Sequence, residues 1–470
     1  MKVVIVNCNR EHAPQTLLPV GACCVAAASE AAGHETQLLD AGFTRAPARV
    51  VRAALQEYQP DVVALSIRNL DNCDAEHPHS YLPEIKDLVA ACRQAGAVPI
   101  LGGTAVSLAP AAMLRYLDCR LAVVGEGERA FPALLRALAD GADPASVPGV
   151  VVIDGNEVKA APPQLCDQLD DFPLVDYSRW LALRHYRARD AAYPVQTKRG
   201  CARKCSYCVY PRLEGSAWRL FAPGRVAEEV RQARLSGLRL VEFVDGLFGL
   251  PSEHAQACCS EIARAPATLP LCTMDLNPAA CTPEMVEAMN AAGFTAVGIT
   301  ADSGSGAMLA GMRKGFTVDL LHRAAAMLRR LRARKIWFFL LGAPGECEAT
   351  MRETARFIAA LPPGDLVYAT FGVRVLPGSD LHRELLAGGV LPPGDDLLWP
   401  RFYFSPRLSP QRAREILAES GFPSLHYTTL HDGGHRLLPI VHRVLVHAGL
   451  RPPYWRYLPW LNRIRRVLRV

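Results

Sequence analysis

The first third of the chain alternates short apolar runs with stretches in which apolar residues recur at helical spacing. The uninterrupted run 62–66 predicts a strand buried on both faces, and residues 17–32, followed by Gly33, predict a helix. Buried strands separated by helices are typical of parallel sheets. Residues 1–154 are therefore predicted to form a doubly wound, Rossmann-like α/β domain. Its predicted strands are residues 3–6, 36–39, 62–66, 98–101 and 121–124.

The same alternation resumes at Tyr193 and gives six strand–helix repeats within residues 190–391. Six repeats are too few for a closed eight-stranded barrel, so they favour an open (β/α)6 partial TIM barrel. Between the two units, residues 155–189 hold prolines and acidic residues without clear periodicity and are predicted to form an ordered linker. Residues 392–470 are predicted to cap the barrel and to contribute to a substrate pocket. The predicted barrel strands are residues 194–197, 240–244, 271–274, 296–300, 336–341 and 367–373.

Polar residues and paired glycines follow the predicted strands of the first domain. Ligands bind beyond the carboxyl ends of the strands in such sheets, so these residues are candidates for binding a cofactor. Adjacent glycines let the backbone approach a large planar ligand closely. No G-x-G-x-x-G follows the first strand, which disfavours an NAD site. The candidates are Asn7, Ser66, Arg68, Asn69, Gly102, Gly103, Thr104, Gly125 and Glu126.

Three cysteines, Cys201, Cys205 and Cys208, lie in one short loop at the start of the second unit. Thiolates spaced C-x3-C-x2-C can hold three irons of a [4Fe–4S] cluster and leave the fourth iron open for a substrate or cosubstrate. A structural cluster or zinc site would normally use a fourth protein ligand. The alternative is a zinc site or three ordinary thiols. The other cysteines are scattered, as small apolar residues in a reducing, cytoplasmic protein would be.

The cysteine loop, with Tyr207 directly before its last cysteine, resembles the signature of the radical S-adenosylmethionine (SAM) enzymes. The first domain resembles the cobalamin-binding domain that precedes the radical SAM domain in one large subfamily. The matching segments are residues 18–21, 32–35, 102–103 and 124–128. The resemblance implies that the open iron chelates the amino and carboxylate groups of SAM, and that the first domain brings cobalamin to face SAM.

One departure concerns the lower face of cobalamin. The D-x-H-x-x-G signature, by which some cobalamin domains supply a histidine to cobalt, is absent from the first domain. The resemblance therefore implies cobalamin without a histidine ligand from that motif. Arg68 follows the third strand, over the expected lower face, where a cation would repel or block a ligand. In the alternative interpretation Arg68 pairs with Asp71 or Asp74 and only shapes its loop.

The resemblance also implies SAM contacts at the ends of successive barrel strands, although turn chemistry alone explains any single serine or glycine there. It implies a C-methyltransferase in which the reduced cluster cleaves SAM to a deoxyadenosyl radical, methylcobalamin supplies the methyl group and a second SAM remethylates cobalamin. The alternatives are a non-methylating ring formation or rearrangement, polar methyl transfer through cobalamin, and a cobalamin- or cluster-binding sensor without turnover. The implied SAM contacts are Asp245, Asp275, Asp302, Ser303 and Gly345.

Charge and hydropathy narrow the range of partners. The net charge of +6 is mild, without the concentrated basic stripe of nucleic-acid-binding proteins. No apolar run reaches the ~18 residues of a membrane span. Residues 451–470 hold six arginines and no acidic residue, which suits a packed terminal helix at least as well as contact with a membrane surface or an acidic carrier protein. We expect a small-molecule substrate, free or carrier-bound, and the family implies flavodoxin or ferredoxin as electron donor.

Overall fold

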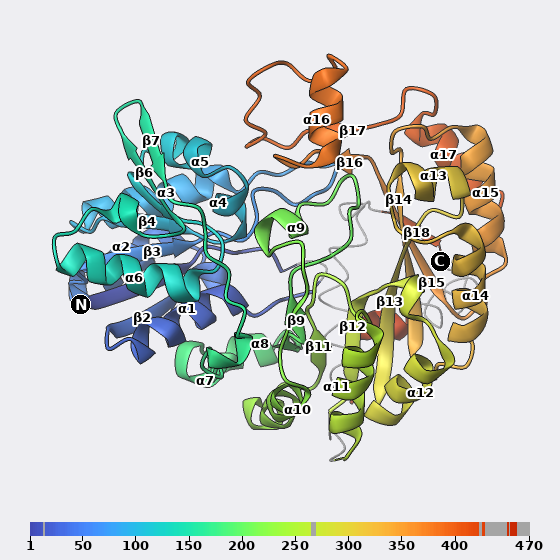
Figure 1. The fold of residues 1–470 in the computed structure, drawn as a ribbon, viewed down its shortest axis with the longest axis horizontal. Coiled ribbons are helices and arrows are strands. Elements are labelled where there is room, and N and C mark those ends of the chain that lie inside the picture. The colour runs from blue at the N-terminus through green and yellow to red at the C-terminus, as the bar shows by residue number, and fades with distance from the viewer. Residues whose placement is uncertain (13–14, 265–268, 423–424, 428–448, 451, 458–470) are drawn as a thin grey trace.

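The computed structural model of the protein describes all residues except 13–14, 265–268, 423–424, 428–448, 451 and 458–470. Two α/β units lie side by side, and the short helix α9 (Tyr210–Leu213) lies between them (Figure 1). Both units are built on a seven-stranded sheet. In this arrangement the carboxyl-terminal ends of the strands in the first sheet face the second unit.

The first sheet has the strand order β2-β1-β3-β4-β5-β6-β7, and β1 to β5 are parallel. Along β1, Val3 and Ile5 belong to one core and Val4 and Val6 to another. Helices α1 and α6 cover one face and α2 and α3 the other, which is why β1, β3 and β5 carry runs of consecutive apolar residues. The strands are β1 (Lys2–Asn7), β2 (Glu35–Asp40), β3 (Val62–Ser66), β4 (Pro99–Gly102), β5 (Leu121–Val123), β6 (Val150–Asp154) and β7 (Glu157–Ala160). The helices are α1 (Val20–Ala31), α2 (Pro47–Tyr58), α3 (Leu82–Gln94), α4 (Thr104–Leu108), α5 (Pro110–Tyr116) and α6 (Gly127–Ala139).

The sheet continues beyond the predicted domain end at Asp154. Strands β6 and β7 form an antiparallel hairpin that extends the sheet at its β5 edge, so a boundary at residue 154 divides the hairpin. All four residues of β7 are exposed, and the strand therefore lacks the apolar signal that marks the others. The linker that follows contains two short helices, α7 (Tyr177–Trp180) and α8 (Leu183–Arg187).

The second sheet is parallel throughout, in the order β18-β15-β14-β13-β12-β11-β8. The predicted six strands are present, and β18 adds a seventh from the C-terminal region that the sequence pattern assigned to a cap. Among the described strands, β8 and β18 do not pair with each other, so the barrel is open. The strands are β8 (Tyr193–Val195), β11 (Val241–Phe243), β12 (Leu271–Leu276), β13 (Phe294–Asp302), β14 (Arg334–Leu341), β15 (Leu366–Phe371) and β18 (Leu425–Tyr427). The helices are α10 (Pro223–Gln232), α11 (Ser252–Arg264), α12 (Pro283–Ala292), α13 (Gly306–Gly311), α14 (Val318–Leu328) and α15 (Glu348–Ala359).

Smaller elements complete the barrel. Two two-stranded sheets pair β9 (Lys198–Arg199) with β10 (Arg219–Leu220), and β16 (Val373–Arg374) with β17 (Phe402–Tyr403). Helix α16 (Asp380–Ala387) and helix α17 (Pro410–Ala418) follow β16. Trp455 packs against a small cluster of barrel residues, namely Ala192, Leu240, Cys272 and Ala296.

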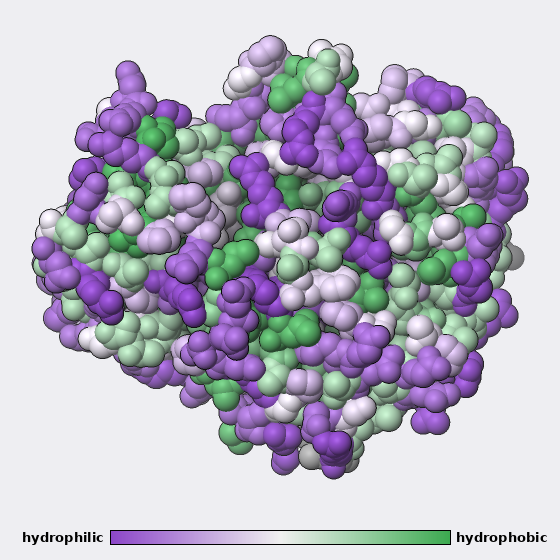
Figure 2. Space-filling model, in the orientation of Figure 1, coloured by the Kyte–Doolittle hydropathy of each residue, from purple (hydrophilic) through white to green (hydrophobic). Residues whose placement is uncertain are grey.

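Most of the arginine-rich segment 451–470, including Trp460, lies outside the described residues. None of the described helices is long and apolar enough to cross a membrane. Hydrophilic residues cover most of the face shown in Figure 2, and apolar residues form small patches between them.

Candidate active site between the two domains

A cavity of about 310 Å³ lies between the carboxyl ends of the first sheet and the barrel strands β8 and β11. The barrel side is lined by alternate residues, Pro194 in β8 and Gln196 just after it, and Glu242 in β11 and Val244 just after it. The predicted residues Asn7, Ser66, Arg68, Gly102, Gly103, Thr104, Gly125 and Glu126 line the other side, whereas Asn69 does not. The strand-end rule therefore located one wall of the cavity.

Two glycines at the end of β4, Gly102 and Gly103, leave this wall without side chains. Gly103 has a φ of +98°, and a Cβ there would lie 2.5 Å from the backbone oxygen of Ile67. Neither an ordinary backbone conformation nor the available space admits a side chain, so glycine is required. At Gly102 the nearest atom to an added Cβ is 3.8 Å away, so a side chain there would take space from the cavity. A wall of bare backbone fits a large planar ligand such as a corrin.

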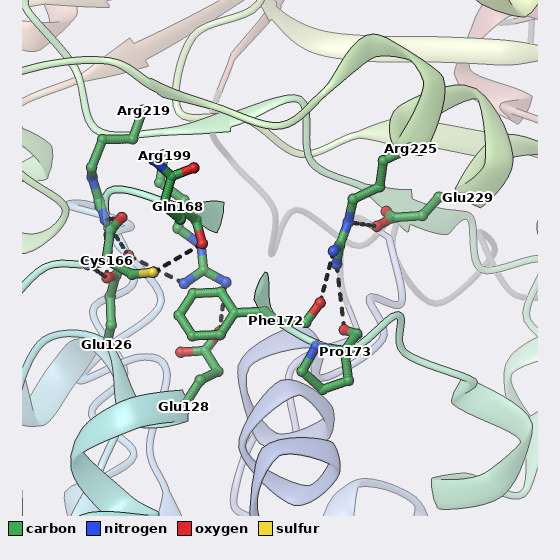
Figure 3. A network of polar contacts seen from close by, with 10 residues as sticks. All are labelled: Glu126, Glu128, Cys166, Gln168, Phe172, Pro173, Arg199, Arg219, Arg225 and Glu229. Atoms are coloured by element: carbon green, nitrogen blue, oxygen red, sulfur yellow. Dashed lines mark hydrogen bonds and ion pairs between the residues drawn. The ribbon is translucent and has the colours of Figure 1, made fainter. Parts of the chain in front are cut away.

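Two of the predicted cofactor contacts are engaged within the protein. Asn7 is buried, and its Nδ2 donates to Oδ1 of Asp40 at 2.8 Å. The Glu126 carboxylate lies 3.2 Å from Nη1 of Arg199 and 2.9 Å from Nη1 of Arg219, and it accepts the backbone N–H of Cys166 at 2.7 Å (Figure 3). Glu126 therefore joins the first domain, the linker and the barrel, and its carboxylate is neutralised before any ligand binds.

Arg68, unlike Asn7 and Glu126, is not engaged by another described side chain. Its side chain is exposed to the cavity and makes no hydrogen bond or ion pair with the described residues. Asp71 pairs with Arg374 instead, at 2.8 Å. Asp74 accepts the backbone N–H of Glu76 at 2.9 Å. Of the two interpretations of Arg68, the geometry supports the one in which its guanidinium faces the cavity.

The cysteine loop runs from β9 to α9. Gly200, just before Cys201, has a φ of +83°, and an added Cβ would lie 2.1 Å from the backbone oxygen of Ala217. Backbone hydrogen bonds hold the loop to distant segments, from Cys201 N–H to Gly215 at 3.0 Å and from Ser206 N–H to Met312 at 3.0 Å. These contacts hold the loop to the fold around it.

The three thiols are free of disulfides. Burial raises the pKa of Cys205, and it raises that of Cys208 to about 11. The thiols must lose their protons to bind iron, so cluster binding releases protons. Among the described residues no three His, Cys, Asp or Glu side chains converge on one ion position. A [4Fe–4S] cluster needs no such convergence because each thiolate binds a different iron. The loop fits the cluster better than it fits zinc.

A buried cation that the sequence analysis did not single out lies beside this loop. Nζ of Lys314 is 2.8 Å from Oδ2 of Asp302, and the hydroxyl of Tyr207 donates to the same carboxylate. Burial lowers the pKa of Lys314, but Asp302 and the Cys205 thiol outweigh burial and raise it overall. Lys314 therefore keeps its charge next to the thiolates, and its partner Asp302 is not a free ligand.

Two of the other predicted SAM contacts, Asp245 and Ser303, are also engaged within the protein. Asp245 is buried and accepts hydrogen bonds from Thr197 Oγ1 at 2.6 Å and Lys198 Nζ at 3.1 Å. Ser303 Oγ lies 3.0 Å from Thr354 Oγ1. These two side chains hold strand ends in place. Burial, followed by the neighbouring Asp245, raises the pKa of Asp275 to about 6. Gly345 has a φ of +92° and open space beside it.

Comparisons with known proteins agree with this geometry. Residues 6–135 match the B12 binding domain and residues 195–358 the radical SAM superfamily. The chain is 27% identical over 454 residues, 82% of this chain and 74% of the relative, to tryptophan 2-C-methyltransferase of Streptomyces laurentii. The fold is similar to that of TsrM, a radical SAM methyltransferase from Kitasatospora setae solved with cobalamin and a [4Fe–4S] cluster, with a TM-score of 0.87 at 22% identity over 100% of this chain and 99% of that one. The cobalamin-dependent radical SAM enzyme OxsB gives a TM-score of 0.71 at 17% identity, over 86% of this chain and 64% of OxsB. The chain belongs to the cobalamin-dependent radical SAM methyltransferases, with cobalamin, a [4Fe–4S] cluster and SAM as its cofactors.

Proposed function

We propose that the protein transfers a methyl group from SAM to a carbon atom of a small molecule. The observation that carries this proposal is the cavity itself, which joins the flat, glycine-edged wall of the B12-binding sheet to the barrel that holds the cysteine loop. The similarity to a tryptophan 2-C-methyltransferase over most of the chain supports carbon as the methyl acceptor.

Some of the site residues would hold the cofactors, and others shape the cavity. Cys201, Cys205 and Cys208 would hold the cluster, and the backbone at Gly102 and Gly103 would bear on cobalamin. When bound, these groups supply the cleavage of SAM and the carriage of the methyl group. Lys314 places a positive charge beside the thiolates.

The surrounding contacts orient these parts. Asp245 fixes the end of β8 through Thr197 and Lys198, next to the start of the cysteine loop. Glu126 and its two arginines tie the cavity wall to the barrel (Figure 3).

We propose a free small molecule as substrate, with tryptophan and indole as the first probes because of the relative's name. A carrier-bound acyl group is the next class to test. The cluster would receive its electron from an external donor of the flavodoxin or ferredoxin type. The scattered free cysteines support a reducing, cytoplasmic location.

The test uses anaerobically reconstituted protein and SAM labelled with deuterium in its methyl group. Labelled methyl on a substrate carbon supports the proposal. Methylated product with equal amounts of deoxyadenosine and S-adenosylhomocysteine indicates the radical route, and S-adenosylhomocysteine alone indicates polar transfer. Deoxyadenosine with an unmethylated but altered product would replace methylation by a rearrangement or ring formation. Failure to consume SAM at all would favour a sensor.

A further inference from the structure

Glu242 is a carboxylate in a strand that is otherwise apolar on its buried faces. Its neighbours Val241 and Phe243 point into the main core. Leu240, Glu242 and Val244 lie on the opposite face of the strand, toward the barrel interior. Glu242 lines the cavity between the domains and is only 7% exposed. Burying a carboxylate costs free energy unless it is paired, so its presence on this wall needs an explanation.

The hydrogen-bond partners of Glu242 do not explain why a carboxylate is buried there. Among the described residues its one hydrogen-bond partner is Gln15, whose Nε2 lies 3.0 Å from Oε2. The other cavity carboxylates are engaged: Glu126 and Glu128 pair with Arg199, and Glu214 accepts a backbone N–H of the cysteine loop at 3.2 Å. Glu242 thus presents a carboxylate to the cavity without a cation within ion-pair distance in the described structure.

Its surroundings place its ionisation near neutral pH. Burial, and then the neighbouring Asp275, raise the pKa of Glu242 to about 7, while the Gln15 hydrogen bond and Arg68 act in the opposite direction. Both protonation states are therefore populated at neutral pH, as an efficient proton acceptor requires. The titratable and charged groups that face Glu242 are Asp275 and Cys272 from β12 and Arg68 from the loop after β3.

We propose that Glu242 accepts the proton that a substrate carbon loses when it gains the methyl group. This inference rests on the proposed C-methyl transfer. In the net reaction the π electron pair of the substrate forms the new carbon–carbon bond, and the sulfur–methyl bond of SAM breaks with its electrons left on sulfur. The C–H electron pair then restores the π system as the proton passes to the carboxylate. No further oxidant or reductant enters this balance.

This role of Glu242 restricts both the substrate class and the route of methyl transfer. Removal of a hydrogen atom by a radical needs no proton acceptor, whereas polar transfer does. A carboxylate that is poised in the cavity therefore favours polar transfer to an electron-rich, unsaturated carbon, as in an aromatic or heteroaromatic ring. A saturated carbon has no π electron pair to form the new bond and would leave Glu242 without a role.

The experiment compares E242Q and E242D with E229Q in the cobalamin-loaded, cluster-loaded enzyme. Glu229, on the outer helix α10, is the matched control because burial also raises its pKa to about 7. Three quantities are measured: bound cobalamin and iron, S-adenosylhomocysteine formed without substrate, and kcat/KM for methylation of L-tryptophan and indole across pH. E242Q should keep the first two and lose methylation by about 100-fold or more, the usual range for a general base. E242D should keep partial activity.

The sign of the pH effect follows from the carboxylate being the active form. Wild-type kcat/KM should fall as pH drops below about 7, and the residual activity of E242Q should lack that acid limb. E229Q should match the wild type in all three measurements. Difference infrared spectra between wild type and E242Q should show a carboxyl band that titrates near neutral pH without any substrate.

Four results would overturn the assignment. The first is methylation by E242Q at the wild-type rate, and the second is loss of cobalamin from E242Q, which would make Glu242 a cofactor contact. The third is absence of the titrating carboxyl band, and the fourth is methylated product accompanied by an equal amount of deoxyadenosine. Wild-type enzyme that forms neither methylated product nor S-adenosylhomocysteine overturns the proposed function instead, and the wild-type arm alone decides that outcome.

Discussion

Asp71, in the loop after β3, and Arg374, in β16 of the barrel, form a buried ion pair that joins the two domains. Nη2 of Arg374 lies 2.8 Å from Oδ2 of Asp71, and the two side chains are 6% and 2% exposed. The same guanidinium donates to the backbone oxygen of Leu397 at 3.0 Å. The loop that carries Arg68 is thereby fixed against the barrel, so this pair sets how one wall of the cavity lies over the other.

Replacing Arg374 with methionine should destabilise the protein strongly. The change leaves the Asp71 carboxylate buried without its partner, which costs about 3–5 kcal/mol in comparable sites. The free energy of unfolding is measured by denaturant titration. R401M is the control, because Arg401 pairs with Asp395 while 59% exposed and should change stability by about 1 kcal/mol or less. The double variant D71N/R374M should recover part of the loss, and an R374M variant as stable as R401M would contradict the prediction.

The cysteine loop gives a prediction about iron. Replacing Cys201, Cys205 and Cys208 together with alanine should abolish the cluster absorbance and SAM cleavage. The wild type should hold about four irons per chain, as a [4Fe–4S] cluster requires. C281A serves as the control, since Cys281 is a partly exposed thiol on another loop whose Sγ–H donates to the backbone of Asn277. A triple variant that still binds about four irons would show that the ligands lie elsewhere.

Much of the fold could be predicted because buried parallel strands leave a strong signal in the sequence. The predicted strands of both units are present, and the family assignment is confirmed by the two domain matches. The missed strands include β6 (Val150–Asp154), which is apolar, and two strands that lack that signal. Strand β7 is exposed at all four positions, and β18 has three residues and pairs with β15 far back in the chain.

The site was predictable in position but not in detail. The strand-end rule identified the cavity wall, and the role of the cysteine loop as the cluster site stays a prediction. The rule could not show which polar side chains are already engaged, because their partners come from distant segments: Glu126 pairs with Arg219, and Asp302 with Lys314. Glu242 was missed, although a glutamate that alternates with Leu240 and Val244 was a signal in the sequence.

Arg68 gives a prediction about the lower face of cobalt. Its guanidinium faces the cavity without a partner among the described residues, and no histidine motif stands in the first domain. We expect the cobalamin-loaded wild type to show the spectrum of cobalamin without a histidine ligand and to stay unchanged when imidazole is added. R68A should still bind cobalamin and should shift its spectrum with imidazole, because the blocking cation is gone.

R49A, at an exposed position on α2, controls for loss of a surface charge. Spectra are recorded by absorbance and by paramagnetic resonance of the reduced, cobalt(II) form. A histidine-nitrogen signal from wild-type protein, or an R68A variant that responds to imidazole no more than the wild type, would contradict this role of Arg68.

Lys314 should set the reduction potential of the cluster. Its ammonium is buried beside Cys205 and Cys208 and holds the carboxylate of Asp302 at 2.8 Å. In K314M the positive charge is gone while the carboxylate remains, so the oxidised cluster is favoured and the potential should become more negative. The double variant D302N/K314M removes both charges and restores the local balance, so its potential should return toward that of the wild type. Potentiometric titration followed by paramagnetic resonance measures this, with K335M as a control on β14. An unchanged potential in K314M with full iron content would show that the cluster does not feel this pair.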